Sequence, residues 1–158
     1  MIKHMSLALI ALSVAAGQAS ALSCIRPDVA AAFNYVAEAD DSFVVLRGSF
    51  DFPTDQLPDP AAPPVAKSIK STFSGDLLTG DGFTDAVEAP VTLALTCAGP
   101  WCGRISPNTD YIAYVLQTDT QLILDVGPCY QFAFPNPTDE TVALVEQCAA
   151  GGDCTPAK

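Results

Sequence analysis

Residues 41–52, DSFVVLRGSFDF, carry the pattern that decides the fold. The run is rich in apolar and aromatic side chains, which predicts a β-strand, and Gly48 stands in its middle. A glycine inside a strand often marks a bulge or a sharp coil. A strand of a small barrel needs such a coil to take part in two sides of the barrel, so this stretch predicts a barrel strand.

Helices are predicted on either side of the strands. The segment RPDVAAAFNYVAEA, residues 26–39, has Pro27 near a first helical turn and is expected to pack one face on a core. Its apolar positions at helical spacing are Val29, Phe33 and Val36. The segment TDETVALVEQC, residues 138–148, begins with Thr138 or Asp139 as a cap and predicts a closing helix.

Four further stretches between these helices have the apolar patterns of strands. They are VAKSIKSTFSGDLL (65–78, one strand or two), PVTLALTC (90–97), YIAYVLQ (111–117) and LILDVG (122–127). The turn TGDG, residues 79–82, follows the first of them. Residues 53–64, PTDQLPDPAAPP, cannot form a helix or an interior strand because of their prolines, and we expect an extended surface loop there.

Two cysteines stand close together in LTCAGPWCGR, residues 95–104. Four residues separate Cys97 from Cys102, whereas a dithiol redox motif has about two intervening residues. Zinc bound by these and two other cysteines is a second alternative, which an oxidising compartment disfavours. The preferred interpretation is a structural disulfide across the Gly-Pro turn between them. Trp101 is then expected to pack over the bridge, with an exposed binding anchor as the alternative.

The start of the chain has the features of a secretory signal peptide. A basic beginning is followed by a short apolar run, residues 7–16, and by small residues up to Ala21. Cleavage after Ala21 would leave one domain, residues 22–158, that is secreted or periplasmic. Acylation of Cys24, which would make a lipoprotein, is the alternative. No later stretch is apolar enough to span a membrane.

The chain is strongly acidic, with 18 Asp and Glu against 7 Lys and Arg. Such a surface repels phosphate backbones and anionic lipid headgroups. We therefore expect neither a nucleic-acid partner nor membrane insertion. The six cysteines, an even number in an exported chain, predict three disulfides.

Catalytic chemistry is restricted because the only histidine, His4, lies in the predicted signal peptide. A mature chain without imidazole excludes Ser-His-Asp and Cys-His catalysis and histidine-ligated metals. A small carboxylate-dependent hydrolase stays an alternative, although so many acids supply carboxylate pairs by chance. The acids around the predicted turn lack EF-hand spacing and are expected to be solvated; they are Asp76, Asp81, Asp85 and Glu88. We expect no enzyme activity, no cofactor and no metal.

Aromatic residues are frequent late in the chain. The residues are Tyr111, Tyr114, Tyr130, Phe132 and Phe134. They form either an aromatic ligand face, as in some OB-folds, or part of the core, which is the preferred interpretation. The acidic composition argues against nucleic acid as the ligand of such a face.

The order of these segments resembles the netrin-like domain, the OB-type barrel also found in tissue inhibitors of metalloproteinases. The likeness covers residues 22–154 and rests on LSC, AAFNYVAEADDSFVVLRGSF, the CG at 102–103, YIAYVLQTDTQLILDVGPC, YQFAF and CAAGGDC. It implies a mainly β protein with a single OB-type five-stranded barrel, flanking N-terminal and C-terminal helices, and disulfide staples. In the family the cysteine after the strand pair bonds to the N-terminal segment. That implies the pairs Cys24–Cys129, Cys97–Cys102 and Cys148–Cys154.

The resemblance also implies what the N-terminus does. The inhibitors begin Cys-x-Cys and chelate the protease zinc with their N-terminal amine and first carbonyl, which a disulfide holds in place. The aligned residues here are Leu22, Ser23 and Cys24, so the first cysteine is missing. We expect an exported protein-binding module whose partner is another protein. Inhibition of a metalloproteinase through Leu22 and Ser23 is the alternative. Trp101 is a further candidate binding residue, and so is Arg104, whose other interpretation is a solvated residue at the start of a strand.

Overall fold

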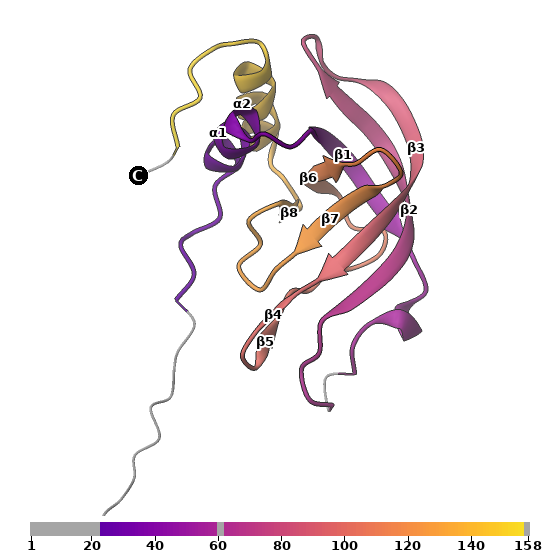
Figure 1. The fold of residues 1–158 in the computed structure, drawn as a ribbon. Helices are drawn as coiled ribbons and strands as arrows, with labels where there is room; N and C mark the ends of the chain where they lie inside the picture. The colour runs from indigo at the N-terminus through magenta and orange to yellow at the C-terminus, as the bar shows by residue number, and fades with distance from the viewer. Residues whose placement is uncertain (1–22, 60–61, 157–158) are drawn as a thin grey trace, which may run out of the picture.

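The helices and strands run from α1 near the N-terminus to α2 near the C-terminus of the computed structural model (Figure 1). The structure describes residues 23–59 and 62–156, so the predicted signal peptide and Leu22 lie outside the described residues. No helix within these two ranges is long and apolar enough to cross a membrane. The elements are α1 (Val29–Glu38), β1 (Phe43–Asp51), η1 (Thr54–Gln56), β2 (Lys67–Thr79), β3 (Gly82–Leu95), β4 (Cys97–Ala98), β5 (Trp101–Cys102), β6 (Tyr111–Gln117), β7 (Leu122–Val126), β8 (Ala133–Pro135) and α2 (Asp139–Ala149).

Strand β1 closes a five-stranded barrel because it pairs along both of its edges. Residues 46–51 pair antiparallel with β2, and residues 43–48 pair antiparallel with β6. The order around the barrel is β1-β2-β3-β7-β6 and back to β1, with β3 and β7 parallel and the other neighbours antiparallel. The predicted fold class is confirmed: a mainly β, five-stranded closed barrel with an N-terminal and a C-terminal helix, consistent with an OB-type barrel.

Gly48 marks the point where β1 passes from one neighbour to the other. It is in register with Tyr111 of β6 and with Gly75 of β2. A Cβ on Gly48 would lie 2.3 Å from the Ser74 carbonyl oxygen, and a Cβ on Gly75 would lie 2.2 Å from the Arg47 carbonyl oxygen. Two backbones this close leave no room for a side chain. The glycine in the middle of β1 therefore lets this strand take part in two sides of the barrel, as its position predicts.

The hairpin of β2 and β3 is longer than predicted. β2 is one continuous strand, and β3 begins at Gly82, well before Pro90. The added part reaches α2, where the Phe83 N–H donates to the Glu146 carboxylate at 3.2 Å. Residues 83–89, FTDAVEA, place acidic and small residues between Phe83 and Val87, which weakens the strand signal, so tertiary contacts decide their conformation.

Apolar side chains form two cores, one inside the barrel and one between the barrel and the helices. Inside, the rings of Phe50 and Phe73 lie with centroids 5.2 Å apart among aliphatic side chains from all the barrel strands. Ile112 and Tyr114 of β6 belong to the second core, with side chains of both helices. The residues of β6 that face into the barrel are Tyr111, Ala113 and Val115. Burial on both faces explains the unbroken apolar run at residues 111–115.

Helix α1 begins later than predicted. The helix starts at Val29, two residues after Pro27, and Asp28 is its N-cap: the Asp28 carboxylate accepts from the Ala31 N–H at 2.8 Å. The Tyr114 hydroxyl donates to the Val29 carbonyl at 2.7 Å and fastens the start of the helix to the barrel. Burial raises the pKa of Tyr114 above its usual range, and the negative charge of Asp28 adds to this effect.

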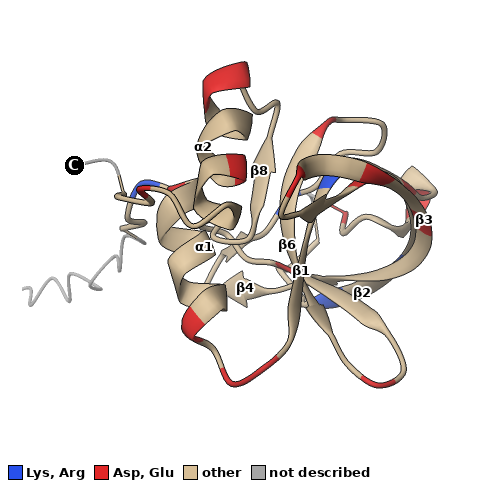
Figure 2. Cartoon of the chain, turned by 90° about the horizontal axis from the view of Figure 1, so that it is seen from above, with Lys and Arg blue, Asp and Glu red and all other residues tan. Residues whose placement is uncertain are grey.

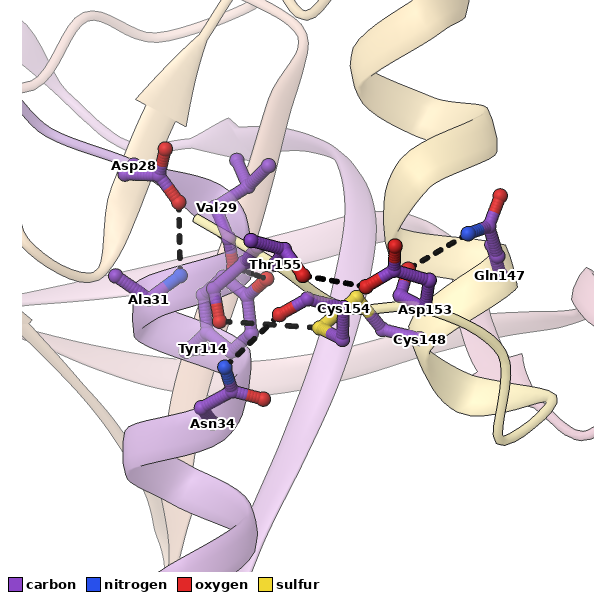
Figure 3. The surroundings of a disulfide bond; sticks show 11 residues. Asp28, Val29, Ala31, Asn34, Tyr114, Gln147, Cys148, Asp153, Cys154 and Thr155 are labelled. Atoms are coloured by element: carbon purple, nitrogen blue, oxygen red, sulfur yellow. Dashed lines mark hydrogen bonds between the residues drawn. A yellow bond between two sulfur atoms is a disulfide. The ribbon is translucent and has the colours of Figure 1, made fainter. Parts of the chain in front are cut away.

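Three disulfides staple the fold, in the pairs that the family resemblance implies: Cys24–Cys129, Cys97–Cys102 and Cys148–Cys154. The third folds the C-terminal tail back towards α1. There the Asn34 amide donates to the Cys154 carbonyl at 3.0 Å, and the Gln147 amide donates to the Asp153 carbonyl at 2.6 Å (Figure 3). Several disulfides in one small domain indicate an oxidising compartment, extracellular or periplasmic.

The proline-rich segment, residues 53–64, contains one short helical turn, which the sequence did not predict. The turn is η1, where the Thr54 carbonyl accepts from the Leu57 N–H at 3.1 Å. Leu57 is partly buried against the barrel core. This tertiary contact stabilises a turn that its own residues favour only weakly.

Candidate functional site

The candidate residue Ser23 lies on an exposed segment that a disulfide fastens to the barrel. Cys24 is bonded to Cys129, shortly after the end of β7. Beside it, Ile25 has 87% of its surface exposed. Leu22, the other candidate in this segment, lies outside the described residues. The described part of the segment is therefore an exposed chain with one fixed point at the end of the barrel.

The hairpin of β4 and β5 lies at the same end of the barrel (Figure 1). Cys97 and Cys102 are opposite each other in its register and are bonded, and Gly99 adopts φ +58° in its turn. The Thr96 N–H donates to the Val126 carbonyl at 3.1 Å, which fastens the base of the hairpin to the end of β7. The N-terminal segment and the hairpin are thus both attached at or just beyond the end of one strand.

Trp101 and Arg104, the remaining candidates, are both exposed. Trp101 has 42% of its surface accessible, and its ring lies 3.8 Å from the position of a Cβ on Gly99. The ring therefore covers the turn of the hairpin and stays accessible. The interpretation of Arg104 as the start of a strand is wrong, because the residue lies in the connection from β5 to β6. The hairpin ends just before it, where the Gly103 N–H donates to the Thr96 carbonyl at 2.9 Å.

Two grooves flank the N-terminal segment, and Pro27 lines both. The first, named the Arg104 groove, has a volume of about 510 Å³, and its walls include Arg104, Tyr111, Tyr130, Phe134, Pro135 and Asn136. The second, named the Ile25 groove, has a volume of about 350 Å³, and its walls include Ile25, Ala31, Tyr35 and Phe132. The candidate binding surface therefore has concave parts as well as exposed ones.

The late aromatic residues belong to the cores, to the groove walls or, as Tyr111 and Phe134 do, to both. Tyr111, Tyr114 and Phe134 are buried, as core packing predicts. Tyr130 and Phe132 are partly exposed, and each lines a different groove. The five residues therefore do not form a single aromatic ligand face.

Sequence reasoning missed two features of the Arg104 groove. Tyr130 and Asn136 both have backbone in the left-handed region, with φ of +51° and +49°. The Asn-Pro pair at residues 136–137 is a turn signal that points to the second of these. Nothing local predicts the first, because an aromatic residue rarely adopts this conformation.

Acidic side chains are spread over the molecule. Figure 2 shows them on both helices, on the β2–β3 hairpin and in loops, with few basic residues. Within the described part of the chain, no three His, Cys, Asp or Glu side chains are placed to hold a metal ion. The acids expected to be solvated lie along the β2–β3 hairpin. Asp81, Asp85 and Glu88 are exposed, and Asp76 is half-buried.

Comparison with known proteins found no relative of this chain. No protein-family model matches it, and no match was found among the curated proteins or among the solved structures. Function is therefore inferred from the geometry of the barrel end.

Proposed function

We propose that this protein is an exported, netrin-like protein-binding module that performs no catalysis. One observation supports the proposal above all others: an exposed N-terminal segment that a disulfide fastens to the barrel and an exposed hairpin closed by its own disulfide lie at one end of the barrel. We name the exposed residues Ser23, Ile25 and Trp101 the tethered end. Large apolar side chains that stand out from a surface are typical of contacts with another protein.

The disulfides contribute to binding by limiting motion before the partner arrives. An ordered segment loses less conformational entropy when it binds than a free one does. The Cys24–Cys129 bond restrains the neighbours of Cys24, and the Cys97–Cys102 bond restrains Trp101. The net charge of −11 also favours a partner with a basic surface, because opposite charges accelerate encounter.

Export is proposed from the predicted signal peptide, residues 1–21, together with the disulfides. The sulfur of Cys24 is bonded to Cys129. A sulfur in a disulfide carries no thioether, so acylation of Cys24 is incompatible with this structure. We therefore propose a secreted or periplasmic protein without a lipid anchor.

Inhibition of a zinc metalloproteinase is a second candidate function, supported by the Cys24–Cys129 bond. In netrin-like inhibitors the corresponding bond is one of two that hold the N-terminus. Cys102 is bonded within its own hairpin, so no second disulfide holds Leu22 and Ser23. This lowers the expected affinity, because the segment must be ordered on binding.

Adding one alanine before Leu22 tests the inhibitor mechanism. The extension displaces the N-terminal amine by up to ~3.6 Å, which is too far for a metal–ligand bond of about 2 Å. If the mechanism operates, the mature protein inhibits a panel of zinc metalloproteinases and the extended form does not. Equal inhibition by both forms, or none at micromolar concentration, contradicts it, and the second result is the one we expect.

A carboxylate-dependent hydrolase has no support in the two grooves. Among their described wall residues Asp28 is the only carboxylate, and it caps helix α1. Glycoside hydrolysis needs a pair of carboxyl groups on either side of the scissile bond. We therefore do not propose this activity.

Photo-crosslinking from the tethered end tests the binding proposal. Benzoylphenylalanine replaces Ile25 or Trp101, and in a control variant it replaces Thr120, which is exposed in the turn at the other end of β7. The variants are expressed with their signal peptide and irradiated in intact cells. We expect one protein, identified by mass spectrometry, to be crosslinked from both positions of the tethered end and not from the control.

Reconstitution completes this test. The identified protein should form a complex with the purified mature chain. I25A and W101A, which remove exposed side chains of the tethered end, should weaken that complex, whereas T120A should not. The proposal fails if all three positions crosslink the same proteins, or if the purified partner does not bind.

A further inference from the structure

The Arg104 groove differs in charge from the rest of the molecule. Arg104 is the only charged residue on its walls, and no carboxylate lines it. Neutral polar side chains on the walls include Ser106, Thr109 and Asn136. On a chain of net charge −11, one guanidinium among hydroxyl and amide groups makes a short-range site for a singly charged anion.

The backbone of Tyr130 is strained where it enters this groove. Its φ is +51°, a value at which an aromatic residue is an outlier. Its N–H donates to the Gly127 carbonyl at 3.2 Å and closes the turn that follows β7. Glycine would adopt this conformation without strain, yet the position carries an aromatic side chain that lines the groove. Strained residues of this kind cluster at functional sites. Asn108 and Asn136 also have positive φ, which asparagine tolerates.

The other walls of the groove are apolar. Phe134, Pro135 and Pro27 line it together with Tyr130. Its volume of about 510 Å³ lies within the range of small-ligand sites, roughly 300–1,000 Å³. A group that fills it therefore combines a single negative charge with an apolar or aromatic part.

We propose that the Arg104 groove binds the C-terminal residue of a partner polypeptide. The Arg104 guanidinium pairs with the α-carboxylate through two parallel hydrogen bonds, and the aromatic and proline walls hold the last side chain. A ligand with several phosphates is disfavoured because the surrounding acidic surface repels it. The inference rests on the proposed binding function and adds the chemistry that the partner presents. Pro27 lines this groove and also follows the tethered end, so one partner can contact both.

Peptide titrations followed by NMR test the inference. The probes are the pentapeptides GSGAF and GSGAL with a free C-terminal carboxylate, the same peptides with an amidated C-terminus, and phenylpropionate as a free aromatic acid. Each is added to the ¹⁵N-labelled mature protein, and the signals of Tyr130, Asn136 and the Arg104 side chain are recorded. We expect saturable shifts with the free-carboxylate peptides and binding at least about tenfold weaker for the amidated ones, as a lost charged hydrogen bond implies.

Two arginine variants locate the charge that is responsible. R104Q should weaken binding of the free-carboxylate peptides by about tenfold or more. R26Q is the matched control, because Arg26 is exposed and lines only the Ile25 groove. It should change binding by less than about twofold, as expected for an exposed, solvent-screened charge that does not line the groove.

The variant Y130G separates a role in binding from a role in folding. Because glycine relieves the left-handed strain, Y130G should unfold at the same or a higher urea concentration than wild type. It should also bind the free-carboxylate peptides more weakly. A lower urea midpoint with unchanged peptide binding would show that Tyr130 serves the fold, and would count against the inference.

Three outcomes of the peptide titrations overturn the inference. They are equal binding of free and amidated peptides, unchanged binding by R104Q, and saturable binding of phenylpropionate with no response to the peptides, which would assign the groove to small free acids. A crosslinked partner that binds equally well when its own C-terminus is amidated would remove this inference and leave the proposed function standing.

Discussion

Replacing Cys24 and Cys129 with alanine should destabilise the protein more than replacing Cys97 and Cys102. The first bond joins residues 105 positions apart, and the second joins residues 5 positions apart. In the chain-entropy model these loops restrict the unfolded chain by about 4.8 and about 2 kcal/mol respectively. C24A/C129A should therefore lower the free energy of unfolding by about 3 kcal/mol more than C97A/C102A does.

Contacts in the native state do not reverse this order. Cys24 is exposed, and Cys129, Cys97 and Cys102 are half-buried. Neither pair of substitutions therefore opens a large cavity in the core. The difference between the two variants should come mainly from the unfolded chain.

Urea unfolding followed by far-ultraviolet circular dichroism measures the difference. Fluorescence is less suitable, because the only tryptophan, Trp101, lies in the hairpin that one variant alters. Against a typical stability of about 5–15 kcal/mol, a loss near 5 kcal/mol brings C24A/C129A close to unfolding at room temperature. Equal destabilisation by the two variants, or a greater effect of C97A/C102A, would refute the reasoning from loop length.

Further predictions concern the barrel, the second core and the long hairpin. G48A should lower the free energy of unfolding by roughly 3 kcal/mol, because its Cβ meets backbone of the next strand. The control G80A, with nothing within 4 Å of its Cβ, should change the free energy of unfolding by under about 0.5 kcal/mol. Similar urea midpoints for the two variants would contradict the close approach of β1 and β2. Y114F should cost about 1–2 kcal/mol near pH 8 by removing a buried hydrogen bond. Above about pH 10 the unfolded tyrosine ionises while folded Tyr114, with its raised pKa, keeps its proton. Wild type should then lose about 1.4 kcal/mol per pH unit that Y114F does not lose, so parallel pH profiles of stability would count against the raised pKa. E146A should speed hydrogen exchange at the Phe83 N–H, because it removes the carboxylate that accepts from this group. E146Q should largely preserve the protection of the Phe83 N–H, because the glutamine amide keeps an oxygen acceptor. Equal protection of the Phe83 N–H in both variants would show that this hydrogen bond does not hold the hairpin.

Much of the fold could be predicted from local patterns in the sequence. The apolar β run around Gly48, the apolar spacing from Val29 to Val36 and the cap at Thr138 each act over a few residues. The α2 cap forms as predicted, with the Thr138 hydroxyl accepting from the Thr141 N–H at 3.2 Å. These local features are enough to predict the β class, both helices and the barrel strand that coils at its centre.

The disulfides could be predicted only in part from the sequence. Their even number in a chain with a predicted signal peptide indicates disulfides, but six cysteines allow 15 sets of three pairs by counting alone. The resemblance to the netrin-like domain implied one of those sets. Only folding brings Cys24 to Cys129, because their proximity depends on where β7 ends relative to the start of α1.

The candidate site was decided by tertiary structure. Nothing within a few residues of Trp101 or Arg104 predicts that one ring stays accessible or that one guanidinium lines a groove without carboxylates. Strand β3 extends to Gly82 because α2 lies beside it, and Tyr130 takes a left-handed backbone because the chain must turn after β7. Periodicity and capping are local and can be read along the chain, whereas strand pairing, exposure and groove shape depend on residues far apart in sequence, and only the folded chain brings those together.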